Sequence, residues 1–139
     1  MADNRPSWMV EHIDRYLKSN GEDGHSWNGV PCLLLSTTGR KSGETRLIPL
    51  IYGRQDDSYI IVASKGGHAH HPSWYLNLAA NPEVEIQVRA NRMKGRCKVV
   101  EGDERAKCWE IMTGIWPAYE EYKARTDRHI PVVVITPHD

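Results

Sequence analysis

The sequence predicts a mainly β domain with flanking helices, an α+β fold, and three patterns support this prediction. Residues 31–37 and 46–53 carry apolar side chains at consecutive positions, which is typical of central strands that are buried on both faces. Residues 84–99 alternate between apolar and polar side chains, as a hairpin with one solvated face does. Between residues 9 and 17, apolar residues recur at helical spacing and indicate an amphipathic helix.

Length, charge and cysteine content limit the classes of protein. The chain has 139 residues, enough for a core of its own, and its 18 basic residues balance its 18 acidic ones. No bulk charge therefore favours nucleic acid as a partner. Three widely spaced cysteines suit neither a disulfide framework nor a zinc site. With no signal peptide and no apolar run of transmembrane length, we expect a cytoplasmic protein.

The N-terminal segment, residues 1–29, is expected to form a helix and a linker that flank the main domain, residues 30–139. Pro6 suits a helix start, and Asn20-Gly21 suits its end. This helix is interpreted as a lid or flank of the domain. Because it is amphipathic, peripheral association with the inner face of the membrane is the alternative.

The remaining helices and strands are predicted from residues that typically begin or end such elements and from the periodicity of apolar residues. Pro72 and Pro117 suit helix starts, Asn81-Pro82 a helix end, and Asp103 a helix cap. The cations on the outer face of the hairpin are interpreted as a solvated edge that discourages aggregation. In order, the elements are strand 59–64, helix 72–80, hairpin strands 84–88 and 93–99, a helix after residue 103, helix 117–126 and strand 131–136.

A basic, glycine-punctuated turn follows the first apolar strand. It sets Arg40, Lys41 and Arg46 against the single anion Glu44, so guanidinium groups and backbone N–H groups could hold an anionic ligand. It is no P-loop, because Arg40 precedes the lysine and a strand follows. The alternative is a charged hairpin turn without a ligand. The predicted binding residues in this turn are Gly39, Arg40, Lys41, Ser42, Gly43 and Arg46.

A second segment leaves its strand through small residues, so that a flat ligand could lie against its backbone. These residues are Ala63, Ser64, Lys65, Gly66 and Gly67. The two segments together predict a cofactor site with an anchor for a charged tail and a ledge for a ring. The nearby histidines His68, His70 and His71 are not expected to bind a metal, because no cysteine or paired carboxylate accompanies them.

Aromatic residues at positions 116, 119 and 122 form a ridge along one side of a predicted helix. They could pack in the core or line a partly solvated pocket, and Trp74 could likewise belong to the core or to a ligand wall. No nucleophile elbow and no Ser–His or Cys–His pair is supported by the spacing. Chemistry carried by a cofactor would need none of these.

Several separated motifs between residues 31 and 137 resemble the deazaflavin-dependent nitroreductase family of actinobacteria, whose members use coenzyme F420. The resemblance implies a split β-barrel related to the FMN-binding and pyridoxamine-phosphate-oxidase-like fold. It also implies hydride transfer from reduced F420 to a quinone, an enone or a nitroaromatic compound. The matching stretches are residues 38–43, 62–67, 71–75, 77–78, 80–82, 116–119, 125–128 and 130–134.

By this resemblance, Arg40, Lys41 and Arg46 hold the anionic tail of the cofactor, and Ser64, Lys65 and Gly66 meet its ring. Ser64 and Tyr119 are the expected catalytic residues. The family usually has tyrosine where this chain has Trp116, so the acceptor preference is open. Further expected cofactor contacts are Pro49, Ala63, Gly67, Trp74 and Asn77, and the expected acceptor pocket is Trp116, Tyr119 and Tyr122.

Two alternatives stand beside this interpretation. Related barrels bind FMN, so an FMN-dependent reductase is the first. A non-catalytic protein that carries the coenzyme or a lipid-like molecule is the second. The expected partner is a small-molecule hydride acceptor, and the choice between monomer and dimer is open.

Overall fold

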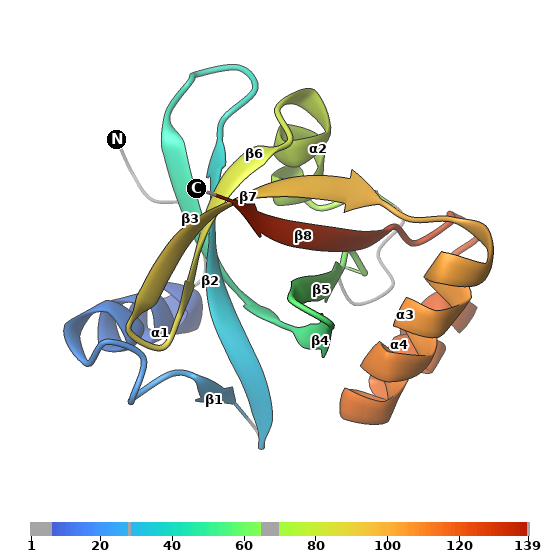
Figure 1. Cartoon of the computed structure of the whole chain (residues 1–139), viewed down its shortest axis with the longest axis horizontal. Helices are drawn as coiled ribbons and strands as arrows, with labels where there is room; N and C mark the ends of the chain where they lie inside the picture. The colour runs from blue at the N-terminus through green and yellow to red at the C-terminus, as the bar shows by residue number, and fades with distance from the viewer. Residues whose placement is uncertain (1–6, 28, 65–69, 139) are drawn as a thin grey trace.

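The computed structural model describes residues 7–27, 29–64 and 70–138, which form eight strands and four helices (Figure 1). The helices are α1 (Ser7–Lys18), α2 (Ser73–Ala80), α3 (Gly102–Ile115) and α4 (Ala118–Ala124). The strands are β1 (Ser26–Trp27), β2 (Val30–Thr38), β3 (Thr45–Ile51), β4 (Gly53–Gln55), β5 (Ser58–Val62), β6 (Glu83–Val88), β7 (Asn91–Val99) and β8 (Val132–His138).

The strands form one antiparallel sheet in the order β1-β2-β6-β7-β8-β5-β4, and β3 pairs with β2. The sheet curls strongly, with α1 on one side and α3 and α4 on the other (Figure 1). The predicted mainly β, split-barrel fold with flanking helices is confirmed. Among the described residues, no helix is long and apolar enough to span a bilayer.

The apolar run in β2 is explained by burial on both of its faces. Leu33 and Leu35 point into the barrel core, whereas Leu34 packs against Ile13 and Tyr16 of α1. All five side chains are at most 6% exposed. Strand β5 is divided in the same way, because Ile61 belongs to the barrel core and its neighbours Ile60 and Val62 belong to the cluster under α3 and α4. Alternation is absent from both sequences because neither face meets water.

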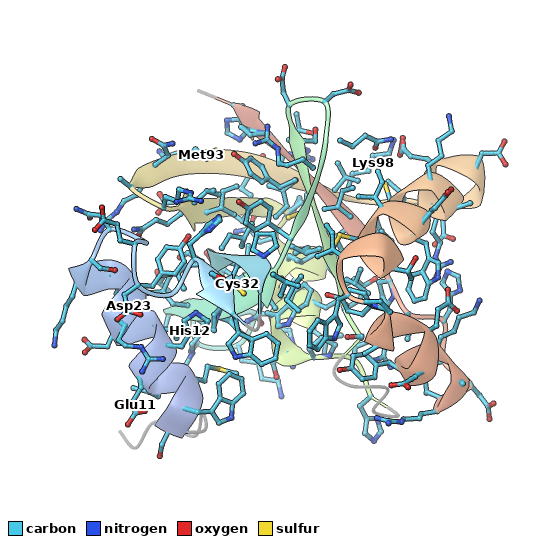
Figure 2. The ribbon with its side chains drawn as sticks, turned by 90° about the horizontal axis from the view of Figure 1, so that it is seen from below. Glu11, His12, Asp23, Cys32, Met93 and Lys98 are labelled. Carbon is cyan, nitrogen blue, oxygen red and sulfur yellow. The ribbon has the colours of Figure 1, made fainter. Side chains whose placement is uncertain are left out.

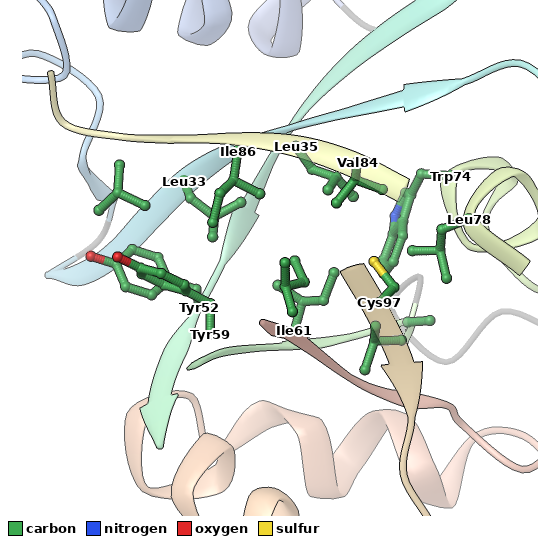
Figure 3. Close-up of a cluster of buried hydrophobic side chains, with 14 residues drawn as sticks. Leu33, Leu35, Tyr52, Tyr59, Ile61, Trp74, Leu78, Val84, Ile86 and Cys97 are labelled. Carbon is green, nitrogen blue, oxygen red and sulfur yellow. The ribbon is translucent and has the colours of Figure 1, made fainter. Parts of the chain in front are cut away.

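The barrel core is closed at its two ends by aromatic residues. Figure 3 shows Trp74 and Leu78 from α2 at one end of the cluster and the rings of Tyr52 and Tyr59 at the other. Trp74 is 7% exposed. Trp74 therefore packs in the barrel core, which is one of the two positions considered for it.

A single buried tyrosine fastens α1 to the sheet. The Tyr16 hydroxyl accepts a hydrogen bond from the Arg89 backbone N–H at 2.8 Å. It lies 3.1 Å from each of the Cys32 and Gln87 carbonyl oxygens, to which it can donate its one proton. A Cβ on Gly21, where α1 turns back with φ near 86°, would overlap the Arg89 backbone. The predicted helix end at Asn20-Gly21 thus also secures a close contact.

Two details of the predicted hairpin differ from strict alternation. Val84 and Ile86 are buried as expected, but Gln87 on the predicted wet face is also buried, because its side-chain amide donates to the Arg89 carbonyl at 2.9 Å. Val99 is exposed, since the strand ends there and the next residue, Val100, enters the core instead.

Two further predictions are wrong. Strand β3 is not central, because its recorded partner among the described residues is β2, and the side chains from Leu47 to Ile51 are only half-buried. Asp103 does not cap α3, since Glu101 occupies the cap position and Asp103 lies in the first turn. Asp103 there still favours the helix through its charge near the N-terminal dipole.

Candidate active site

The half-buried apolar face of β3 forms part of a cavity of about 970 Å³, at the upper end of the range for ligand pockets. Figure 2 views the molecule from below, with α1 and its residue His12 on the left, α3 and α4 on the right, and Cys32 between them. Cys32, His12 and the side chains from Leu47 to Ile51 line the cavity. The exposure of β3 thus follows from its place on a cavity wall.

Residues predicted from separate stretches of the sequence meet on this one cavity. The basic turn supplies one part of the wall, and Trp116, Tyr119 and Tyr122 supply another. The predicted cofactor residues on the wall are Gly39, Arg40, Lys41, Ser42, Arg46, Pro49, Ser64, Trp74 and Asn77.

Among the described residues, two predicted ones, Gly43 and Ala63, are not part of the lining. Gly43 shapes the basic turn with a φ of 74°, and Ala63 is fully buried, its N–H donating to the Pro131 carbonyl at 3.0 Å. Lys65, Gly66 and Gly67 lie outside the described residues, as does Pro6, the predicted helix start.

Sequence reasoning missed the contribution of the N-terminal region to this wall. Trp8, Met9 and His12 of α1 line the cavity together with Trp27 of β1. The amphipathic pattern predicted that α1 would pack against the domain but carried no information about which surface it would meet. Trp27 had no distinguishing pattern around it, and its ring contact with Trp116, at 5.4 Å between centroids, is a long-range feature.

A buried amide organises the basic end of the cavity. Asn77, which is 5% exposed, accepts hydrogen bonds at its Oδ1 from the Arg40 backbone N–H at 3.2 Å and from Arg40 Nη1 at 2.8 Å. Its Nδ2 donates to Thr37 Oγ1 at 3.4 Å. Lys41 is exposed, and Arg46 pairs with Glu44 at 3.2 Å. All three cations are exposed but differ in their partners, since Arg40 bonds to Asn77 of α2 whereas Arg46 pairs with Glu44.

The aromatic end is both a pocket wall and part of the core. Tyr119 is 5% exposed, and its ring lies 6.3 Å from that of Trp109 and 6.0 Å from that of Tyr122. Trp116 Nε1 donates to the Tyr122 hydroxyl at 3.3 Å, which holds the two side chains together. The two interpretations of the ridge are thus not exclusive, because one side of it packs on α3 and another faces the cavity.

Among the hydroxyl groups on the cavity wall, those of Ser64, Ser73 and Tyr119 have no hydrogen-bond partner within the described part of the chain. Burial, with smaller effects of Cys32 and Tyr122, raises the pKa of Tyr119 above its ordinary value. Tyr119 is therefore a protonated hydrogen-bond donor at physiological pH. Burial also raises the pKa of the Cys32 thiol to about 12, so this cysteine is not a thiolate nucleophile.

Known proteins match this sequence over nearly the whole chain. The sequence profile of the F420H2-dependent quinone reductases matches residues 8–137. An F420H2-dependent quinone reductase of Mycobacterium tuberculosis strain H37Rv is 45% identical over 142 residues, covering 93% of this chain and 95% of that protein. This chain belongs to the F420H2-dependent quinone reductase family.

Solved structures agree with the family assignment. An F420H2-dependent reductase aligns with a TM-score of 0.71 and 42% identity, over 76% of this chain and 93% of that one. A second structure, described as a domain-swapped dimer, aligns with a TM-score of 0.73 and 38% identity. The alignment covers 92% of this chain and 96% of that one. A structure of the pyridoxamine 5'-phosphate oxidase type from Listeria innocua shares the fold alone, at 11% identity and a TM-score of 0.54. The family, the oxidoreductase class and the cofactor F420 implied by the sequence motifs are confirmed.

The ion pair between Glu44 and Arg46 predicts that Glu44 competes with an anionic ligand for the guanidinium. Glu44→Gln should lower the dissociation constant for F420 about two- to five-fold, because it removes an exposed ion pair worth about 0.2–1 kcal/mol. The measurement is a fluorescence titration, with Glu22→Gln on the α1–β1 connection as control. A weaker affinity in Glu44→Gln would mean that the carboxylate orients Arg46 for the ligand instead.

The pKa values of two histidines lie below 6.5, their ordinary value, and this predicts that the protein becomes less stable as the pH drops below about 6.5. Burial, and secondarily Arg89 or Arg128, lowers the pKa of His25 and His71. Just below pH 6.5 the unfolded chain therefore binds more protons than the folded chain does. The free energy of unfolding declines as the pH falls through this range. His25 Nε2 lies 2.8 Å from the Tyr52 hydroxyl, and His71 Nδ1 lies 3.0 Å from Arg128 Nη1.

Melting temperatures from about pH 7.5 to about pH 5.5 test this prediction. The double variant His25→Gln, His71→Asn keeps hydrogen-bonding atoms near the same places but does not titrate. It should lose less melting temperature over this range than the unsubstituted protein does. Equal losses in the two proteins would assign the pH dependence to other groups.

Proposed function

We propose that this cavity binds F420H2 and that the protein uses it to reduce a quinone. The observation that supports this proposal is the joining, in one cavity, of a basic end and an aromatic end across an apolar wall. A cofactor with a polyanionic tail and a flat ring needs both ends. The cavity residues Arg40, Lys41 and Arg46 would hold the tail, and Ser64, Pro49 and Trp74 would lie along the ring.

When bound, reduced F420 supplies a hydride from its C5 atom. The protein then has to orient the acceptor, exclude water and deliver one proton to the acceptor oxygen. Tyr119 can donate a hydrogen bond to that oxygen, because its hydroxyl is protonated and has no hydrogen-bond partner among the described residues. Ser64 can donate to the ring or to the acceptor. Trp116 and Tyr122 would limit the shape of the acceptor.

Titration with F420 and with FMN, followed by oxidation of each reduced cofactor in the presence of quinones, tests the proposal. We expect tighter binding of F420, because three cations line the tail end and FMN offers a single phosphate. This affinity should fall as salt rises, since the cations Lys41 and Arg46 are exposed. Stoichiometric FMN in the purified protein, with no response to F420, would favour the FMN-dependent alternative. F420 binding without quinone-dependent turnover would favour a carrier.

We also propose that the protein works at the cytoplasmic face of the membrane, with α1 touching the lipid surface. Trp8, at 55% exposed, and Val10, at 36%, offer apolar contacts on α1 beside the cavity. Cosedimentation with anionic vesicles should fall in Trp8→Ser if this is correct.

We propose that the protein forms a dimer, because a related structure is described as a domain-swapped dimer. Light scattering after gel filtration measures the oligomeric state.

A further inference from the structure

Arg128 lies outside the cavity wall, yet its guanidinium reaches the segment that carries Ser64. Nη2 donates to the Ser64 carbonyl at 2.7 Å, and Nη1 donates to the Ala63 carbonyl at 3.0 Å. Nη1 also lies 3.0 Å from His71 Nδ1. Because an arginine side chain has no acceptor, the His71 ring must accept this bond at an unprotonated Nδ1.

These contacts join three segments that each contribute to the cavity. Arg128 follows α4, the helix of Tyr119 and Tyr122. Ser64 follows the end of β5, and His71 directly precedes the Pro72 cap of α2, the helix of Trp74 and Asn77. The Arg128 backbone is itself held, since its N–H donates to Thr126 Oγ1 at 3.2 Å. One side chain therefore sets the relation between the aromatic wall, the Ser64 ledge and the start of α2.

Only an arginine can make this set of bonds. The guanidinium is planar and presents several N–H donors in a rigid fork, whereas a lysine ammonium is a compact charge on a flexible stem. Arg128 is half-buried, and desolvation lowers its pKa, so the site holds the cation through hydrogen bonds to carbonyl oxygens.

We infer that Arg128 is a positioning residue for the reductase, which sets the Ser64 ledge against the aromatic wall so that the cofactor ring and the acceptor meet in register. This inference rests on the proposed function of the cavity. Arg128 acts through Ala63, Ser64 and His71 rather than by touching the cofactor.

The test compares Arg128→Lys with Arg105→Lys. Arg105 is a matched control because it also donates to a backbone carbonyl, that of Ile130 at 2.9 Å, but neither Ile130 nor Trp109, over whose ring it lies, lines the cavity. Arg128→Lys should weaken F420 binding or lower turnover at saturating F420 by about ten-fold or more, as expected for lost charged hydrogen bonds. Its melting temperature should stay close to that of Arg105→Lys. In Arg128→Ala, added guanidinium ion should restore part of the function, and methylammonium should not.

A second readout needs no cofactor. In the unliganded protein labelled with ¹⁵N-histidine, the His71 ring should show an unprotonated Nδ1, and its pKa should rise in Arg128→Lys, because the fork and part of the coulombic effect of Arg128 are lost. A protein that shows this change but never oxidises F420H2 would refute the proposed function and leave the Arg128 contact intact.

The inference is overturned if Arg128→Lys keeps both affinity and turnover within about two-fold of the unsubstituted protein. It is equally overturned if Arg128→Lys loses melting temperature while affinity and turnover per folded molecule are unchanged, since Arg128 would then serve stability alone. Should Arg128 variants fail to fold, His71→Leu removes one acceptor from the other side. His71→Asn, which keeps an acceptor, should behave better than His71→Leu.

Discussion

Tyr119→Phe should lower turnover with a quinone by about 100-fold while leaving the fold and the affinity for F420 unchanged. The expected size follows from the contribution of a positioned proton donor, roughly 10²- to 10⁴-fold. Removing the hydroxyl leaves the ring in place between Trp109 and Tyr122, so the packing of α4 is retained. No hydrogen bond to another described residue is lost, because the Tyr119 hydroxyl makes none, and the backbone N–H keeps its bond to the Trp116 carbonyl.

The measurement pairs acceptor kinetics with melting temperature on the same variant. Tyr75→Phe is the control, because this tyrosine packs on the barrel core and is not part of the cavity wall. In the unsubstituted protein, the basic limb of the pH–rate profile should lie well above neutrality, since the pKa of Tyr119 is raised. Unchanged turnover in Tyr119→Phe would move the proton donor elsewhere, with Ser64 as the next group to test.

Truncation of the same residue separates its two roles. Tyr119→Ala should lower the free energy of unfolding by about 3–5 kcal/mol, because it removes a buried ring from the cluster under α3 and α4. Tyr119→Phe should lower it little. A Tyr119→Ala variant that is as stable as the unsubstituted protein would show that the ring contributes to the pocket and not to the core.

The double variant Lys41→Ala, Arg46→Ala should raise the dissociation constant for F420 about 100-fold. Each charged hydrogen bond to the ligand is worth about 1.5–3 kcal/mol, so each substitution alone is expected to weaken binding ten-fold or more. Turnover at saturating F420 should change far less, because the β2–β3 turn that carries these cations lies far in the fold from α4, which carries Tyr119 and Tyr122 (Figure 1). Both side chains are exposed, so the fold should be unaffected.

Fluorescence titrations at low and high salt measure the effect, with Lys107→Ala on the exposed surface of α3 as control. The affinity of the double variant should depend less on salt than that of the unsubstituted protein, since two screened cations are gone. If turnover collapses while affinity is retained, the basic turn does not hold the cofactor tail.

Much of this protein was predictable from local sequence. The periodicity of α1, the proline starts of α2 and α4, and the alternation of β6 and β7 depend on neighbours a few residues away, and the structure has these elements where they were expected. The motifs around Arg40 and His71 were specific enough to indicate the family, which the profile match confirms. These patterns can be recognised in the sequence because backbone geometry and cofactor chemistry restrict which residue types suit a short segment.

The tertiary structure decided the rest. An apolar run such as 46–53 does not reveal whether its side chains meet a core or a cavity, and β3 meets the cavity. Charges alone did not show that Asn77 holds Arg40 while Glu44 pairs with Arg46. The contacts of Trp27 with Trp116, and of Arg128 with Ser64, join residues far apart in the chain. Such pairs depend on how the sheet curls, and that curvature is a property of the whole assembled barrel rather than of any one segment.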